Sequence, residues 1–219
     1  MKKPKRSLPG PVSFIRQTLK AFHTTGAIAP SSSVLARAML RALPRQDQIP
    51  EDYQVLEVGP GTGPITVALA ERMSASGQLQ VYEINPAFVE HLKERIAHES
   101  CFQAMGERLT VHLGNILDLD APKRFDVIIS GLPFNNFKPE EVRRFLEHFK
   151  GLLKPTGTLT FFEYYGLRPL QQPFVKRERR ERLKGIAHVV DEFVKTYQFD
   201  QQIIWRNLPP ARARHLRLN

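Results

Sequence analysis

The residues best suited to chemistry form a glycine-rich stretch that begins with an acid. This stretch reads Glu57-Val58-Gly59-Pro60-Gly61-Thr62-Gly63. Its glycines let the backbone turn sharply and approach a ligand, and a helix that starts after them offers unpaired N–H groups. A dinucleotide-binding loop is spaced G-x-G-x-x-G, whereas the spacing here is G-x-G-x-G. Because Glu57 would repel a pyrophosphate, the stretch favours a positively charged ligand.

Two more polar residues stand where expected strands end. Glu83 closes the second expected strand, where a carboxylate can accept hydrogen bonds from both ribose hydroxyls of an adenosine. Asn115 follows the third expected strand, and its side-chain amide can pair with an adenine edge. Taken alone, Glu83 could be a solvated acid at a strand end, and Asn115 could be a turn asparagine. Together with the glycine stretch, they indicate an adenosine-containing ligand.

Alternating strand and helix patterns must position these residues. We expect strands at 53–58, 79–83, 109–113, 125–130, 158–163 and 201–205. We expect helices at 34–42, 64–73, 86–98, 139–153 and 186–197. This order predicts the α/β class, with one doubly wound, mostly parallel sheet whose ligands bind at the carboxyl ends of the strands. A chain of 219 residues is long enough for one such core.

The net charge of +10 is concentrated at the two ends of the chain. Residues 1–45 hold nine Lys and Arg with no acid, residues 46–164 have a net charge of −6, and residues 165–219 have a net charge of +7. This segregation indicates a polyanionic partner, either nucleic acid or an anionic membrane. The single cysteine, Cys101, excludes an intrachain disulfide and fits the cytoplasm. No apolar run approaches the ~20 residues of a membrane span.

The N-terminal region is predicted to form a basic extension over residues 1–45, ahead of the main domain at residues 46–219. Within it, Ile15, Leu19 and Phe22 are spaced as one face of an amphipathic helix with a basic polar side. Such a helix could pack on its own domain or lie in a membrane interface. A loop at 24–30 follows, and Ser31–Ser33 are candidate N-caps of the next helix.

The glycine stretch, the segment Tyr82-Glu83-Ile84-Asn85-Pro86 and the segment Gly114-Asn115-Ile116 together resemble class I S-adenosylmethionine-dependent methyltransferases over about residues 50–165. This cofactor carries a sulfonium and an ammonium, which suits Glu57. The resemblance implies a seven-stranded sheet, S-adenosylhomocysteine as product and no metal. It implies that the cofactor contacts Glu57, Gly59, Pro60, Gly61, Thr62, Gly63, Glu83, Ile84, Asn115, Ile116 and Ser130.

The segment Ser130-Gly131-Leu132-Pro133-Phe134 follows the fourth strand, where such folds place the group that is methylated. Methyl transfer requires the nucleophile, the methyl group and the sulfur to lie in line, so positioning of the reactants supplies much of the reduction in the reaction barrier. Backbone carbonyls of the turn could orient an amine, and an aromatic ring could stabilise its cation. Packing in the core is the alternative role for such rings. The candidate catalytic residues are Leu132, Pro133, Phe134, Tyr164 and Tyr165.

The same turn resembles two families. Ribosomal RNA adenine dimethylases usually read Asn-Leu-Pro-Tyr or Asn-Leu-Pro-Phe there, but Gly131 occupies the Asn position in this chain. Bacterial phospholipid N-methyltransferases, which act on phosphatidylethanolamine, fit better. That resemblance also rests on Thr25-Gly26-Ala27-Ile28-Ala29-Pro30-Ser31-Ser32 and on Asn207-Leu208-Pro209-Pro210-Ala211, so it covers most of the chain.

The second resemblance implies N-methylation of phosphatidylethanolamine or a related aminolipid, with phosphatidylcholine as the product of full methylation of phosphatidylethanolamine. The expected enzyme is a cytoplasmic monomer, peripheral on the inner face of the cell membrane, with an anionic membrane surface as partner and no DNA. The alternative is an RNA adenine N6-methyltransferase, and a non-catalytic lipid or RNA binder is the third reading. Candidate substrate- and membrane-binding residues are Thr25, Ser31, Ile15, Leu19, Phe22, Arg168, Lys176 and Arg177.

Overall fold

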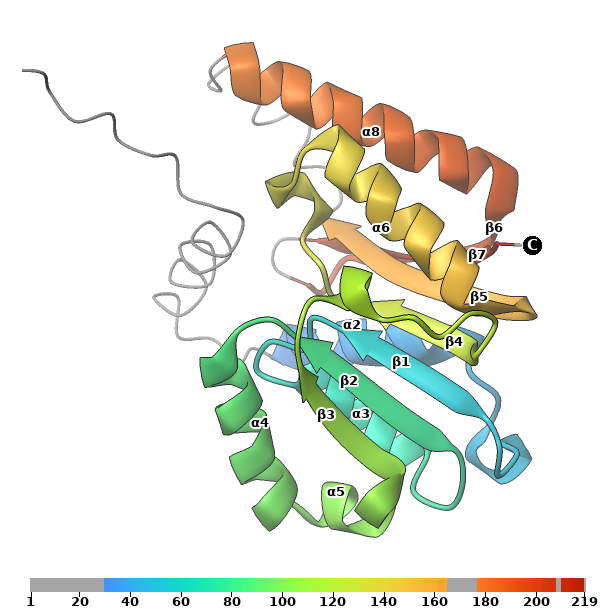
Figure 1. The fold of residues 1–219 in the computed structure, drawn as a ribbon. Helices are drawn as coiled ribbons and strands as arrows, with labels where there is room; N and C mark the ends of the chain where they lie inside the picture. The colour runs from blue at the N-terminus through green and yellow to red at the C-terminus, as the bar shows by residue number, and fades with distance from the viewer. Residues whose placement is uncertain (1–29, 165–176, 208–209, 219) are drawn as a thin grey trace, which may run out of the picture.

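Figure 1 shows a computed structural model that describes residues 30–164, 177–207 and 210–218. Several predicted site residues lie outside this part of the chain: Ile15, Leu19, Phe22, Thr25, Tyr165, Arg168 and Lys176. The expected amphipathic helix at the N-terminus also lies outside it. These predictions therefore stay untested.

A seven-stranded sheet forms the centre of the molecule, with the strand order β3-β2-β1-β4-β5-β7-β6. The strands are β1 Gln54–Val58, β2 Gln78–Glu83, β3 Leu109–Leu113, β4 Phe125–Ser130, β5 Leu153–Tyr164, β6 Gln198–Ile204 and β7 Ala211–Arg217. Strands β1 to β5 pair in parallel, whereas β7 is antiparallel to both β5 and β6. The predicted α/β fold with a doubly wound, mostly parallel sheet is confirmed.

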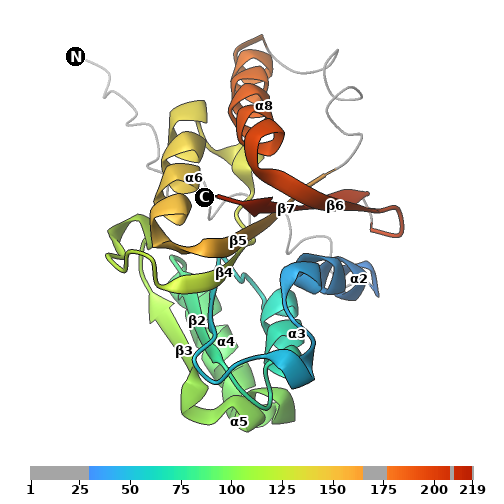
Figure 2. The ribbon, with the colours of Figure 1, turned by 90° about the vertical axis from the view of Figure 1, so that its right-hand side faces the viewer.

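Helices cover both faces of this sheet (Figures 1 and 2). They are α2 Pro30–Met39, α3 Pro64–Arg72, α4 Pro86–His98, α5 Ser100–Met105, α6 Pro139–Leu152 and α8 Arg177–Tyr197. One hydrophobic cluster packs side chains of α2, α3, α4 and α5 against the sheet, and we refer to this side as the α3 face. The second cluster packs α6 and α8 against the opposite side, the α6 face.

The central strands show why the sequence folds this way. Strands β1 and β4 are short apolar runs, and their residues from Val55 and Val127 onward are buried, as expected for parallel strands covered on both faces. Proline occupies the first turn of α3, α4 and α6, where its missing N–H removes no intrahelical hydrogen bond. The chain can therefore leave each strand and enter a helix within a short turn.

The structure corrects several expected element bounds. Helix α2 begins at Pro30, so Ser31–Ser33 lie within its first turn rather than capping it. Its residues Ala36 and Met39 are 1% and 0% exposed, which places residues 30–45 against the same core as the rest of the described chain. Helix α8 begins at Arg177 instead of residue 186.

Two elements were not located from the sequence. Helix α5 was not expected, and strand β7 was missed although it lies between β5 and β6. The sequence of β7, Ala-Arg-Ala-Arg-His-Leu-Arg, contains too many arginines to read as a buried strand. None of the described helices is long and apolar enough to cross a membrane.

One edge of the sheet collects the ends of most strands. Strands β1 to β5 are parallel, so all five end there, at what we refer to as the carboxyl edge. Strand β6 runs in the same direction as β5, since both pair antiparallel with β7, so the β6–β7 turn also lies at this edge. Helix α8 begins near it (Figure 1). Binding residues contributed by different strands can therefore meet at the carboxyl edge.

Candidate cofactor and acceptor site

The glycine loop leaves the carboxyl end of β1 and enters α3. Gly59, Gly61 and Gly63 have φ values of +71°, +58° and +84°, a region that side chains with a Cβ rarely adopt. The N–H of Gly59 donates to the carbonyl of Tyr82 on β2 at 2.9 Å, which ties the loop to the neighbouring strand. Strand β1 lies between β2 and β4, where the chain order reverses. This is the switch point at which such sheets bind ligands.

A buried carboxylate stands just behind this loop. Glu57 is 1% exposed, and neither of its carboxylate oxygens has a hydrogen-bond partner among the described residues. Burial raises the pKa of Glu57 to about 8, the nearby Thr66 hydroxyl partly opposes the rise, and Glu83 adds to it. An unpaired buried carboxylate is unfavourable unless a positive charge approaches it. Glu57 therefore fits a ligand that brings a cation into the loop.

The second acid stands at the end of the neighbouring strand β2. Glu83 is 5% exposed at the end of β2, and its Oε1 accepts a hydrogen bond from the N–H of Asn85 at 2.8 Å. Its Oε2 accepts a longer one, 3.3 Å, from the N–H of Gly61. Burial raises the pKa of Glu83, and these backbone donors partly lower it again. The glycine loop and Glu83 are thus in direct contact, as a shared ribose site requires.

Asn115 follows β3 and caps a short 3-10 turn, η4 Ile116–Asp118. Its Oδ1 accepts a hydrogen bond from the N–H of Leu117 at 3.1 Å. The carbonyl half of the side chain is thus engaged inside the protein, and its NH2 group is the half suited to face an adenine. Ile116, the next residue in the chain, is buried with 4% of its surface exposed.

Two supporting residues were missed by sequence reasoning. Arg95 of α4 donates from Nη1 to the carbonyl of Thr62 in the glycine loop at 2.6 Å. Nε2 of His148 on α6 lies 2.8 Å from the carbonyl oxygen of Ile116. Because a carbonyl oxygen can only accept, Nε2 carries the proton and donates it to this hydrogen bond. Both come from helices far along the chain, and no local pattern signals such contacts. The other predicted cofactor residues lie on the same loops, with Pro60 buried and Ile84 half-buried.

The turn at residues 130–134, which we refer to as the acceptor turn, packs its backbone directly against the backbone of the glycine loop. The N–H of Gly131 donates to the carbonyl of Val58 at 2.8 Å, and a Cβ at position 131 would overlap with the carbonyl oxygen of Gly59. Ser130 is fully buried, and its Oγ accepts from the N–H of Leu132 at 3.3 Å. The turn that follows the fourth strand therefore lies directly against the glycine loop.

The aromatic candidates divide between the two faces of the sheet. Phe134 is 6% exposed, and its ring packs 5.3 Å from that of Phe161 on the α6 face. Tyr164 packs edge-on against Phe162 at 5.7 Å on the α3 face, and burial raises the pKa of its hydroxyl. Phe161 and Phe162 are neighbours on β5 and point to opposite faces, so the rings that pack on them, Phe134 and Tyr164, do not share one wall. Both rings pack in the structure as core residues do.

Of the predicted substrate-binding residues, Ser31 lies in the first turn of α2. Arg177 is the first residue of α8. It is exposed and pairs with Glu181 one turn later at 3.1 Å. The described residues contain no group of acids, histidines and cysteines able to hold a metal ion.

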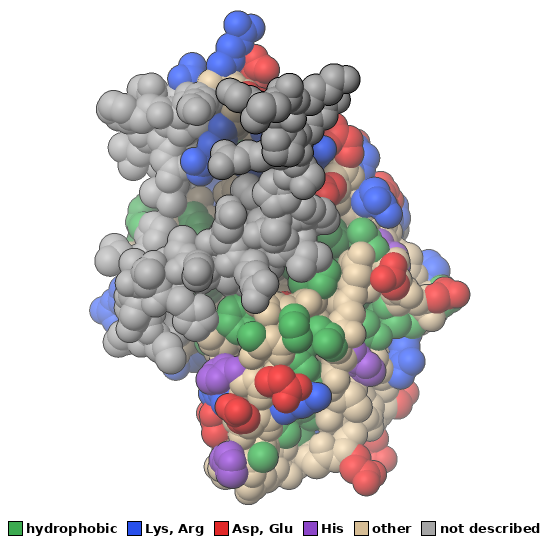
Figure 3. All heavy atoms as spheres, turned by 60° about the vertical axis from the view of Figure 1, so that its left-hand side comes forward, with side chains coloured by type: hydrophobic (Ala, Val, Ile, Leu, Met, Phe, Trp, Pro, Cys, Tyr) green, Lys and Arg blue, Asp and Glu red, His purple; other side chains and the backbone are tan. Residues whose placement is uncertain are grey.

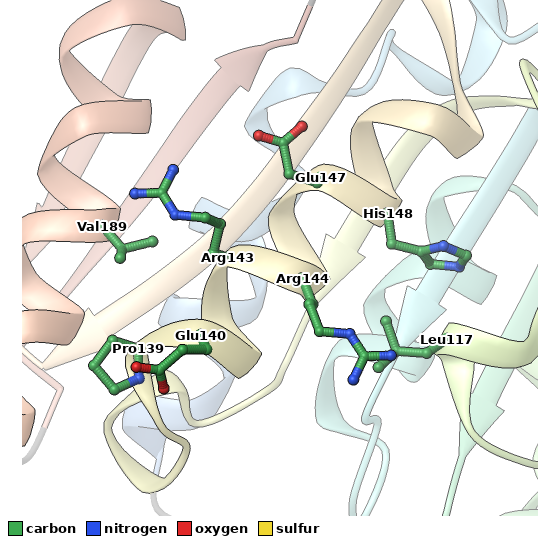
Figure 4. Close-up of a pocket in the computed structure, with 8 residues that line it drawn as sticks. All are labelled: Leu117, Pro139, Glu140, Arg143, Arg144, Glu147, His148 and Val189. Atoms are coloured by element: carbon green, nitrogen blue, oxygen red, sulfur yellow. The ribbon is translucent and has the colours of Figure 1, made fainter.

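A separate pocket of about 840 Å³ lies on the outer side of α6 (Figure 4). It is lined by Leu117, Pro139, Glu140, Arg143, Arg144, Glu147, His148 and Val189. Arg143, one of these lining residues, forms an ion pair with Glu192 of α8 at 2.8 Å. The pocket contains none of the predicted cofactor residues, and it mixes both signs of charge, so we do not assign it to the methyl donor.

Comparison with known proteins agrees with this geometry. A methyltransferase-domain model matches residues 55–157. Ornithine lipid N-methyltransferase of Singulisphaera acidiphila is 31% identical over 200 residues, covering 91% of this chain and 92% of that protein. A probable ribosomal RNA small subunit methyltransferase A of Methanococcoides burtonii is 28% identical over 136 residues, covering 62% of this chain and 46% of that protein. The crystal structure of a SAM-dependent methyltransferase of Methanosarcina mazei gives a TM-score of 0.59 at 14% identity, covering 77% of this chain and 93% of that protein.

The fold, the loop with Glu57 and Glu83, and these matches define a class I methyltransferase that uses S-adenosylmethionine. The chain belongs to the S-adenosylmethionine-dependent methyltransferase family, and within it resembles a lipid N-methyltransferase along nearly its whole length. The sequence predictions of family and cofactor are confirmed.

Proposed function

We propose that this protein transfers methyl groups from S-adenosylmethionine to the amine of an aminolipid at a membrane surface. The observation that carries this proposal is the extent of the match to ornithine lipid N-methyltransferase, 91% of this chain and 92% of the relative. The match therefore includes segments beyond residues 55–157, which the methyltransferase-domain model covers. We further propose that the protein acts as a monomer on the inner face of the cell membrane.

Phosphatidylethanolamine and ornithine lipid are both candidate acceptors. The sequence motifs favour the first, and the name of the relative favours the second. Both present an amine at the head of a lipid, so one acceptor turn could serve either.

The acceptor turn offers carbonyl oxygens to such an amine. The carbonyl of Leu132 accepts from the N–H of Phe134 at 3.0 Å, and that of Pro133 accepts from the N–H of Asn136 at 2.8 Å. Each carbonyl has a second lone pair, which can accept an N–H of the substrate. When bound, the cofactor supplies an electrophilic methyl group on a sulfonium. The turn would hold the neutral amine so that its lone pair points along the line of transfer.

A ribosomal RNA adenine is the second candidate acceptor, because the M. burtonii relative is also similar. That match covers 46% of the relative. Gly131 has no side chain to accept a base amino group, and its contact with Gly59 leaves no space for one. These two observations favour the lipid.

The test is methyl transfer from labelled S-adenosylmethionine to three acceptors in parallel. The acceptors are anionic vesicles with phosphatidylethanolamine, the same vesicles with ornithine lipid, and total bacterial ribosomal RNA. We expect label in the organic phase for at least one lipid, and chromatography then counts the methyl groups. Label confined to the RNA would overturn the proposal. The Glu83→Gln variant should lower the transfer to every acceptor, since Glu83 belongs to the cofactor site.

A further inference from the structure

The described start of the β6–β7 turn, Trp205–Asn207, carries the most exposed large hydrophobic side chain of the described chain, and we use the name β6–β7 turn for these three residues below. Trp205 is 67% exposed, ahead of Leu113 at 58% and Phe199 at 51%. Arg206 beside it is also exposed. The turn itself is anchored, because Asn207 is 7% exposed and its N–H donates to the carbonyl of Ile204 at 3.3 Å. An exposed indole and an exposed guanidinium are therefore neighbours in a turn that is tied to the end of β6.

This turn lies at the carboxyl edge, which also carries the acceptor turn. Strand β6 is three strands away from β4, about 14 Å at the usual strand spacing, and the pairing register carries the end of β6 three residues further along the sheet than Ser130. Figure 3 views the molecule from near this edge, and where described residues form the visible surface, hydrophobic side chains lie between charged ones. A flat partner that touches the β6–β7 turn would thus lie close to the site of methyl transfer.

The charge near this edge suits an anionic partner. Helix α8 begins there with the residues Arg-Glu-Arg-Arg-Glu-Arg at 177–182, four arginines against two acids. Each Lys or Arg near an anionic leaflet contributes on the order of 1 kcal/mol to binding. Tryptophan is enriched at membrane–water interfaces, because its ring is apolar and its N–H can reach polar headgroups.

We propose that the β6–β7 turn docks this protein on an anionic lipid bilayer, with Trp205 inserted among the headgroups and Arg206 beside it. The proposal rests on the proposed function, since it gives the carboxyl edge access to a lipid amine. It adds a docking element distinct from the basic start of α8 and from the amphipathic helix that the sequence predicts near the N-terminus.

The chain contains a single tryptophan, so its fluorescence reports on this turn alone. We would add the wild-type protein to vesicles of phosphatidylethanolamine and phosphatidylglycerol, with and without lipids brominated near the headgroup. We expect emission at shorter wavelength and quenching by the brominated lipid. Unchanged emission while the protein sediments with vesicles would overturn the proposal, and so would an absence of sedimentation. A response to ribosomal RNA but not to vesicles would also overturn it.

Phe199 provides a matched control on the same strand. It is an exposed aromatic residue at the opposite end of β6, where its ring contacts Arg217 at 5.0 Å. We expect Trp205→Ala to weaken vesicle binding about tenfold, and Phe199→Ala to leave it within twofold of wild type. Equal losses in the two variants would overturn the assignment to this turn.

Activity separates this proposal from the proposed function. With a short-chain aminolipid that is monomeric in solution, Trp205→Ala should be as active as wild type, whereas on vesicles it should be slower. If neither form of aminolipid accepts methyl groups, the proposed function fails, while the fluorescence still decides the docking. If both accept methyl groups and the tryptophan emission does not change, only the docking proposal fails.

Discussion

Gly131 of the acceptor turn lies directly against the carbonyl oxygen of Gly59 in the cofactor loop. The N–H of Gly131 also donates to the carbonyl of Val58 at 2.8 Å, so the two loops are joined through their backbones. Any β-carbon at position 131 would have to displace one of them. The loop expected to bind the methyl donor and the turn expected to hold the acceptor therefore depend on each other's position.

The first prediction concerns this contact. Gly131→Ala should lower methyl transfer by at least tenfold and reduce the melting temperature, because the new Cβ overlaps with Gly59. Gly151→Ala is the matched control, since Gly151 is exposed in α6 and a Cβ there meets nothing within 4 Å. That control should be neutral or stabilising by about 0.5–1 kcal/mol. Full activity of Gly131→Ala would show that the turn can shift without cost.

The second prediction concerns proton release on cofactor binding. With its pKa near 8, Glu57 is mostly protonated at pH 7 in the free protein, and a ligand cation should ionise it. Calorimetry at pH 7 in buffers of different ionisation enthalpy should therefore count about one proton released per S-adenosylmethionine bound. Glu57→Gln should release none and bind at least tenfold more weakly. Binding of the wild type without proton release would contradict this role for Glu57.

The third prediction concerns stability without cofactor. The folded pKa of Glu57 is raised from 4.5 to about 8, so between these pH values the folded state binds more protons than the unfolded state. The contribution of Glu57 to the free energy of unfolding therefore falls as pH rises through this window. At pH 8, Glu57→Gln should have a higher melting temperature than wild type, by about 2–4 °C for each kcal/mol that the substitution adds to the free energy of unfolding. The difference in melting temperature should be smaller near pH 5. Parallel pH profiles of the two proteins would disprove it.

The fourth prediction concerns the second acid. Glu83→Gln keeps the shape of the side chain but removes its charge and one acceptor, while Asn85 and Gly61 both donate to it. Loss of a charge-assisted hydrogen bond costs about 1.5–3 kcal/mol, so S-adenosylmethionine should bind about tenfold to a hundredfold more weakly by calorimetry. Glu90→Gln, an exposed acid on α4, is the control and should bind as wild type does.

The fifth prediction concerns a positioning residue. His148 holds the carbonyl of Ile116 at 2.8 Å, so His148→Phe should loosen the turn expected to flank the adenine. We expect the KM for S-adenosylmethionine to rise about threefold to tenfold with kcat nearly unchanged, since one neutral hydrogen bond contributes about 0.5–1.5 kcal/mol. His148→Gln retains a donor and should recover part of the loss. A fall in kcat alone would indicate a different role.

The fold and the cofactor loops were predictable because local patterns encode them. Apolar runs predicted β1 to β4 within a residue at each end, and prolines marked the first turns of α3, α4 and α6. The acids Glu57 and Glu83 stand at strand ends, so any parallel sheet brings them to one edge. Strand β7 escaped prediction because its buried Arg214 is tolerated only through distant partners, Glu163 at 2.8 Å and Gln198 at 2.7 Å.

The sequence by itself therefore determined the family, the methyl donor and the loops expected to bind it, since periodicity and glycine spacing act over a few residues. Only the tertiary structure decided that Phe134 and Tyr164 pack on opposite faces, that His148 supports Ile116, and that Trp205 is exposed at the carboxyl edge. These relationships join residues far apart in the chain. They depend on the order and direction of strands, which local residue patterns do not encode.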